Sequence, residues 1–243
     1  MILVAHFGHK KEGMNMNTKA KILMPYLSFC LMTLAVTLML NCGKDKNENP
    51  PAPQFTVIGI SGNVVNMDGT WTAPCFYSAQ DQEDSLDTVT FSGRSFTYIS
   101  TSWSASVTSN CTQTALPDVV INVTGSATTG ATGTAIWMDG NTPAPAPAGI
   151  PVNAKATAAA IAYSSAVATL QSDEYVTIAN TNSVCGGGWV KNVAKNVLNC
   201  TDIIDVTSFQ DYWVVDDSAS PLKYYSNYDD IAWHVDIKSI MTK

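Results

Sequence analysis

The sequence predicts an all-β protein, an antiparallel up-and-down barrel with one short helix, which follows a signal peptide and a tether. Strand-like segments recur about every 10 residues with turn residues between them, as in barrels and sandwiches. Thr, Ser, Val, Ala and Gly dominate the later chain, and this composition favours strands over long helices. Six tryptophans, all after residue 70, are expected to fill the barrel interior.

Residues 1–41 are predicted to be an over-long start and a signal peptide. Lys19 and Lys21 precede an apolar run from Ile22 to Leu40, which is the pattern of an export signal. The run is also long enough to span a bilayer, so a retained membrane anchor is the alternative. The ending Leu40-Asn41-Cys42-Gly43 resembles the lipobox of bacterial lipoproteins, whose cysteine becomes the lipidated N-terminus. This resemblance implies lipid attachment at Cys42 and a place in the bacterial cell envelope, on the outer membrane or cell surface rather than the inner membrane.

Residues 42–54 form the predicted disordered tether, because the segment is polar and proline-rich and has little to bury. Residues 55–243 form the predicted barrel, a length that suits one domain with its own core. From Cys42 onward the chain carries nine basic and 19 acidic residues, a formal charge of −10. Nucleic acid is therefore not an expected partner, because binding it needs a basic face.

Trp71 stands in the opening strand of the predicted barrel, after a lead-in segment from Phe55 to Val65. Asp68-Gly69 before it is a tight-turn pair, because glycine accepts a positive φ. We expect Trp71 to be buried, to plug one end of the barrel and to pack against the final strands, at Trp233 or Val235. An ordinary hairpin with a buried tryptophan is the alternative.

Alternation with a period of two marks the next strands, since every second side chain faces the same side of a sheet. The clearest hairpin joins 88–91 to 96–103 through Ser92-Gly93, after an acidic loop at 80–87. The other predicted strands cover 119–123, 135–138, 160–170, 212–215, 223–225 and 231–237. The alanines of 154–170 also suit a helix. A short helix is predicted from Ser172, as its N-cap, to about Asn180, with acidic residues in the first turn.

Four cysteines lie beyond the predicted cleavage site: Cys75, Cys111, Cys185 and Cys200. An even number in an exported chain suggests two disulfides, for which three pairings are possible. We prefer Cys75–Cys111 and Cys185–Cys200, because each pair closes a local loop, and free buried thiols are the alternative. The sequence has no Cys-x-x-Cys, so neither a zinc site nor a thioredoxin-like redox pair is expected.

Several of these segments together resemble a group of uncharacterised bacterial secreted proteins and lipoproteins with a lipocalin-like fold: Gly69-Thr70-Trp71 with Cys75, Val89 to Gly93, Asn110-Cys111-Thr112 and Cys185 to Val197. The resemblance implies a lipocalin-like barrel over about residues 69–243. In lipocalins this tryptophan packs across the closed end, often against a basic side chain from the last strand. Lys223 or Lys238 would have to supply that side chain here. The group has no function that transfers residue by residue.

Catalytic and metal-binding patterns are scarce. His234 is the single histidine after Cys42, and its alternating surroundings are typical of a partly exposed strand histidine rather than of a catalytic triad. Asp81, Glu83, Asp84 and Asp87 supply oxygen ligands of the kind calcium prefers, but their spacing is not that of an EF-hand, and a solvated loop is the favoured interpretation. We therefore expect no catalytic residue, no metal site and no cofactor.

Three function classes remain open. The leading hypothesis is a non-catalytic envelope lipoprotein whose barrel holds a small apolar ligand. The second is a surface interaction protein, an adhesin or antigen, with a solid barrel and binding loops. An enzyme is the third, because catalytic groups are so few. The sequence leaves the oligomeric state open.

Overall fold

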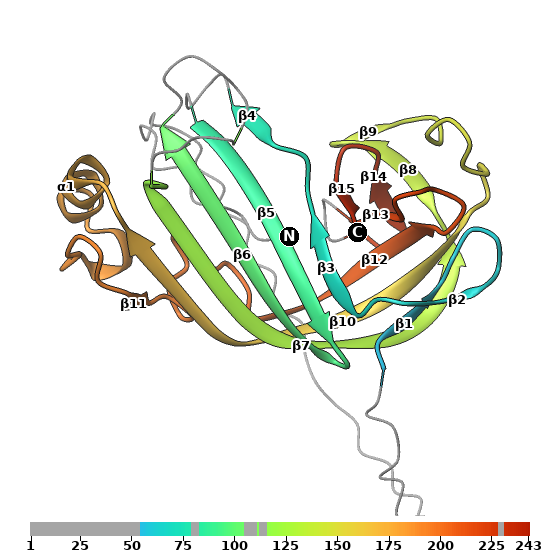
Figure 1. Ribbon diagram of the computed structural model, residues 1–243, viewed down its shortest axis with the longest axis horizontal. Coiled ribbons are helices and arrows are strands. Elements are labelled where there is room, and N and C mark those ends of the chain that lie inside the picture. The colour runs from blue at the N-terminus through green and yellow to red at the C-terminus, as the bar shows by residue number, and fades with distance from the viewer. Residues whose placement is uncertain (1–53, 79–82, 105–110, 112–115, 228–230) are drawn as a thin grey trace, which may run out of the picture. The chain divides into compact units, whose positions relative to one another are not determined.

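The computed structural model describes residues 54–78, 83–104, 111, 116–227 and 231–243 (Figure 1). The predicted signal peptide, the lipid site at Cys42 and almost all of the predicted tether lie outside these residues. Among the described residues no helix is both long and apolar enough to cross a membrane.

Eight antiparallel strands close into a barrel. They are β3 (Gly69–Thr72), β5 (Glu83–Ser92), β6 (Ser95–Ser104), β7 (Val119–Thr134), β10 (Lys155–Leu170), β12 (Ser208–Asp216), β13 (Lys223–Tyr225) and β15 (Ile240–Thr242). Each pairs with the next of them in the chain, and β15 returns to β3 through the pair Thr242 and Thr72. This is an up-and-down order, so the predicted all-β, lipocalin-like barrel is confirmed.

The other elements lie at the ends and on the outside of the barrel. They are the hairpin of β1 (Thr56–Ile58) and β2 (Val64–Asn66), β4 (Phe76–Ser78) beside β5, β11 (Lys195–Asn196) beside β10, and the sheet of β8 (Ile136–Asp139), β9 (Thr142–Pro143) and β14 (His234–Asp236). One helix, α1 (Asp173–Thr181), follows β10, and a 3-10 turn spans Val184–Gly186.

The predicted hairpin of β5 and β6 is present and longer than expected, with ten residues in each strand. Gly93 makes its turn at φ 58°, a conformation that suits glycine. Asp68, which precedes β3, accepts a hydrogen bond from the backbone N of Gly93 at 2.8 Å. The turn before Trp71 therefore also anchors the neighbouring hairpin.

Residues 155–170 form a strand in full, so the helical alternative for this alanine-rich segment is wrong. β10 pairs with β7 along almost its whole length, and Ala166 and Ala168 pair with Val123 and Ile121 on the inner face. Pairing and burial between two long strands outweigh the helix propensity of alanine, which is worth only a fraction of a kcal/mol per residue.

The helix predicted from the sequence is present as α1. Ser172 is the N-cap of α1, and its side chain accepts a hydrogen bond from the backbone N of Glu174 at 3.2 Å. Asp173 and Glu174 lie in the first turn, where negative charge is favourable.

The final strands differ from the prediction. The segment predicted as a last barrel strand, 231–237, contributes β14, which pairs in parallel with β8 outside the barrel. The closing strand is β15, which the sequence analysis missed. Tyr212, Trp213, Val214 and Val215 are all buried, so β12 needs apolar cover on both faces. The small sheet supplies that cover on the outside.

The tryptophans are distributed over several layers, so the expectation that all six fill the barrel interior is wrong. Trp71 and Trp213 belong to the interior cluster, whereas Trp137 packs in the outer cluster under β8 and Trp189 packs near α1.

Candidate functional site

An aromatic floor seals one end of the barrel. It consists of Phe55, Trp71, Phe91, Trp213 and Tyr224, all buried. Trp71 has no exposed surface, and its indole N–H donates to the backbone O of Met67 at 2.8 Å. The ring of Tyr224 meets Trp71 edge-on at 5.1 Å and stacks on Trp213 at 5.1 Å between centroids. Trp71 is thus buried within the floor, as the sequence led us to expect.

The partners of Trp71 differ from those expected. Trp233 packs on Tyr212 at 4.9 Å, and Val235 lies in the outer cluster, because the segment that carries both residues leaves the barrel. The basic side chain over the Trp71 ring is Lys243, with Nζ 5.4 Å from the ring centroid. Lys243 also donates to the backbone O of Asp68.

Neither basic residue proposed for that role holds it. Lys238 pairs instead with Asp139 at 2.6 Å, outside the barrel. Lys223 is paired in register with Asp216 at the start of β13. The position over the tryptophan belongs to the residue that directly follows β15, a strand that the sequence analysis did not predict.

Above the floor, solvent reaches inward-facing side chains. Trp213 and Val215 on the inner face of β12 are buried, but Phe209 and Asp211 on the same face are only half-buried. Tyr98 on β6 and Tyr163 on β10 also face inward and are half-buried. The half-buried part of the inner wall therefore lies between the floor and a second buried cluster, in which Val123 and Ala168 pack with Trp189.

Five of these inward-facing residues form what we call the interior site: Asp87, Tyr98, Ser100, Tyr163 and Asp211. Asp87 and Ser100 are directly paired across β5 and β6. Asp211 is paired with the inward-facing Ala159 of β10, and Tyr163 with Gly125 of β7. The site thus draws polar groups from β5 and β6 on one side of β7 and from β10 and β12 on the other.

Gly125 explains how two rings of this region meet. A Cβ at Gly125 would lie 2.3 Å from the backbone O of Ala162 and 2.7 Å from the Phe96 ring. Without it, Phe96 on one side and Tyr163 on the other approach across β7, at 6.1 Å between centroids.

Burial governs the ionisation of the interior site. It raises the pKa of the Asp87 carboxyl, and the nearby Ser100 and Tyr98 hydroxyls offset only part of that rise. It likewise raises the pKa of Asp211, whose Oδ1 accepts hydrogen bonds from the backbone N of Asn227 at 3.0 Å and of Tyr212 at 2.7 Å. The phenols of Tyr98 and Tyr163 stay protonated, because burial raises their pKa as well.

The acidic segment is not a solvated loop, which corrects the sequence interpretation. Glu83, Asp84 and Asp87 lie within β5, and Asp84 has no exposed surface. Glu83 accepts a hydrogen bond from the hydroxyl of Tyr175 on α1. Adjacent strand residues point to opposite faces, so Glu83 and Asp84 cannot converge on one ion. Asp81 lies outside the described residues.

Both predicted disulfides are present. Cys75 is joined to Cys111 and Cys185 to Cys200, with Cα atoms 5.6 Å and 5.3 Å apart. Cys185 and Cys200, with Asp202, are the one group in the described part of the chain that is spaced to hold a metal ion. Because a disulfide leaves no thiolate for coordination, this group is not a metal site.

His234 lies half-buried on β14, in the small sheet rather than in the interior site. Sequence reasoning placed Asp87 in a solvated loop and did not propose Asp211 as a site residue. The signal was available, because each continues an alternation of inward apolar residues: Asp87 with Val89 and Phe91, and Asp211 with Trp213 and Val215.

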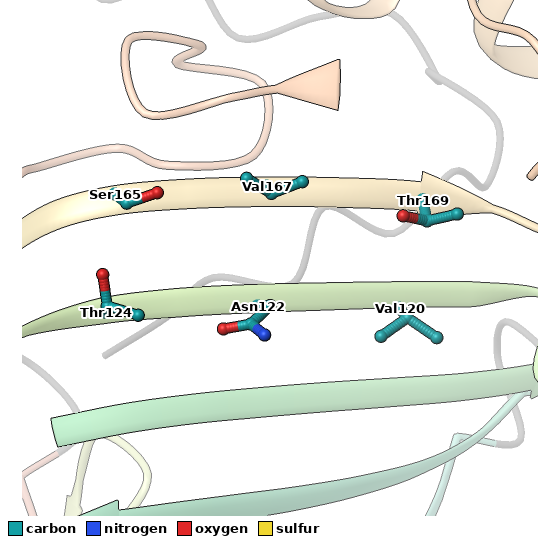
Figure 2. A pocket seen from close by; sticks show the side chains of 6 residues that line it. All are labelled: Val120, Asn122, Thr124, Ser165, Val167 and Thr169. Atoms are coloured by element: carbon teal, nitrogen blue, oxygen red, sulfur yellow. The ribbon is translucent and has the colours of Figure 1, made fainter. Parts of the chain in front are cut away.

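A hollow lies on the outer face of the barrel, and Figure 2 shows the side chains that line it. It has a volume of about 390 Å³ and runs along β7 and β10. It is lined by Val120, Asn122 and Thr124 of β7 and by Ser165, Val167 and Thr169 of β10. These side chains are directly opposite one another in the register and point away from the inner face.

The fold and the interior site define a lipocalin-like barrel with an aromatic floor and with half-buried polar and aromatic side chains on its inner wall. No protein-family model matches the chain, and no curated protein is significantly similar to it.

Proposed function

We propose that this protein is a non-catalytic binding protein of the bacterial cell envelope, anchored through a lipid on Cys42, that holds a small ligand inside its barrel. The proposal rests on the partial exposure of four inward-facing side chains above the aromatic floor: Tyr98, Tyr163, Phe209 and Asp211. By contrast, Trp213 in the floor and Val123 and Ala168 nearer α1 are fully enclosed.

The interior suits a ligand with an apolar body. Tyr98, Tyr163 and Phe209 are half-buried on the inner wall, and their rings offer apolar surface to such a body. Ligand sites in proteins are mostly apolar and carry a few placed polar groups, which is the composition found here. A non-catalytic role fits the described interior, since His234 lies in a different sheet.

Binding of a neutral apolar dye, N-phenyl-1-naphthylamine, tests this function in a protein that begins near residue 50. Ser85 lies on the inner face of β5, two residues from Asp87, and is half-buried, so Ser85→Trp should fill part of the interior. We expect it to weaken dye binding at least tenfold. Thr90→Trp, exposed on the outer face of the same strand, is the matched control and should leave binding unchanged. Equal binding by wild type and Ser85→Trp would exclude the interior.

The outer hollow favours the second candidate function, a surface interaction protein. Asn122 in its lining is exposed and the Val, Thr and Ser residues are half-exposed, so the hollow is mixed in polarity, as protein interfaces often are. If the dye binding of the same experiment responds to Val167→Trp and not to Ser85→Trp, the outer face is the binding surface.

The lipid anchor is tested separately by labelling cells with a radioactive fatty acid. The wild-type protein should carry the label and Cys42→Ala should not. Lipidation is expected to hold the protein firmly, because each buried CH₂ contributes about 0.8 kcal/mol and such cysteines carry more than one chain. Label retained by Cys42→Ala would show that the cysteine is not the attachment site.

A further inference from the structure

We propose that the interior site recognises a small organic cation, an ammonium group on an apolar body, held between the carboxylates of Asp87 and Asp211 and against the rings of Tyr98 and Tyr163. This inference rests on the proposed function, ligand binding inside the barrel, and names the chemical class of the ligand.

The charge of the inner wall supports a cation. Asp87 and Asp211 face inward from β5 and β12. Lys223 precedes the inward-facing Tyr224 on β13, so its side chain points to the outer face. Lys243 is exposed at the floor end of the barrel, where it donates a hydrogen bond to the backbone O of Asp68. Two inward carboxylates therefore have no inward basic partner among the described residues.

A second observation is independent of charge. Ser100 is 2% exposed, faces Asp87 across the strand pair, and its Oγ has no hydrogen bond of ordinary geometry among the described residues. Asp87 Oδ1 is also buried, close to the Ser100 and Tyr98 hydroxyls that lower the pKa of its carboxyl, and it too has no hydrogen bond of ordinary geometry among the described residues. Buried polar atoms without partners are rare, since each forfeits its hydration. An ammonium donates several hydrogen bonds, so one bound group supplies partners to both oxygens.

The aromatic neighbours suit the same ligand. Tyr163 packs edge-on against Phe96 at 6.1 Å and Phe209 at 5.5 Å between centroids, which fixes its ring on the inner wall. Ring faces attract cations, more strongly where water is excluded. Burial raises the pKa of the Asp87 and Asp211 carboxyls, because it disfavours their charged forms. A bound ammonium would stabilise the two carboxylates and so offset this effect.

Asp211 also has a structural role, and the test must separate the two. Its Oδ1 accepts the backbone N–H groups of Asn227 and Tyr212. Asn keeps a carbonyl oxygen at this position, so Asp211→Asn can preserve those bonds while it removes the charge. Asp87→Asn likewise removes the charge beside Ser100 and keeps a carbonyl oxygen there.

The experiment is calorimetric titration of the full-length protein in detergent with three probes of similar size: 2-phenylethylammonium, 2-phenylethanol and 3-phenylpropionate. We expect the cation to bind at least tenfold more tightly than the alcohol, and the anion to bind least. Asp87→Asn and Asp211→Asn should each weaken cation binding at least tenfold and leave alcohol binding unchanged. Ser100→Ala, which changes no charge, should weaken cation binding about threefold.

Asp173→Asn is the matched control, because Asp173 is exposed on α1 and its loss changes net charge without touching the interior. It should bind all three probes like the wild type. A cation that binds no better than the alcohol, or variants that lose both probes equally, would overturn the inference while dye binding upholds the proposed function. Failure of the dye itself to bind the interior would instead overturn the proposed function.

Discussion

Trp71→Ala should destabilise the barrel by about 3–5 kcal/mol, the usual cost of removing a large buried aromatic side chain. The residue has no exposed surface, and its loss would leave a cavity between Tyr224 and Met67 and an unpaired backbone carbonyl at Met67. That is a large part of the ~5–15 kcal/mol that stabilises a typical domain. Denaturant unfolding of a protein that begins near residue 50 measures the loss.

Two controls define the result. Phe76 is 62% exposed on β4, so Phe76→Ala should cost less than about 1 kcal/mol. Trp71→Phe keeps most of the packing and removes the indole N–H, so it should cost less than Trp71→Ala. A loss below about 1 kcal/mol for Trp71→Ala would show that the floor does not depend on this side chain.

Removal of the Cys75–Cys111 disulfide is expected to have an effect of similar size. The bond closes a loop with a sequence separation of 36, and the chain-entropy model assigns such a crosslink on the order of 3–4 kcal/mol. Cys75 lies between β3 and β4, so the bond holds the opening strands of the barrel to the segment that follows β6. The double substitution of both cysteines by serine, followed by denaturant unfolding, measures the loss.

The second disulfide provides the comparison. Cys185–Cys200 has a sequence separation of 15, for which the same model gives about 3 kcal/mol, so its removal should cost slightly less. Reduction of the wild-type protein should lower its stability by more than either double substitution alone. If loss of Cys75–Cys111 leaves the unfolding midpoint unchanged, the opening strands do not depend on the crosslink.

Local chemistry made much of this fold predictable. Ser172 and the two acids after it mark the start of α1, and the Ser92-Gly93 turn with its flanking alternation marks the hairpin of β5 and β6. An even number of cysteines at two short spacings led to the correct disulfide pairs. Caps, turns and short loops depend on residues near one another in the chain, and one sequence contains that information.

Tertiary structure decided the rest. β15 is three residues long and meets β3 at a single register pair, Thr242 with Thr72, a contact that no local pattern encodes. For the same reason Lys243, and neither Lys223 nor Lys238, lies over Trp71. Asp87 was taken for part of a solvated loop because its sequence neighbours are acidic.

The interior site shows the distinction most clearly. Asp87 and Asp211 are separated by more than 120 positions and share no motif, yet closure of the barrel places both on its inner wall. The face of the strand on which each residue lies follows from alternation along that strand, so it could be predicted from the sequence. Only strand order and register determined that the two faces enclose one space, because those depend on how the whole barrel buries its aromatic residues.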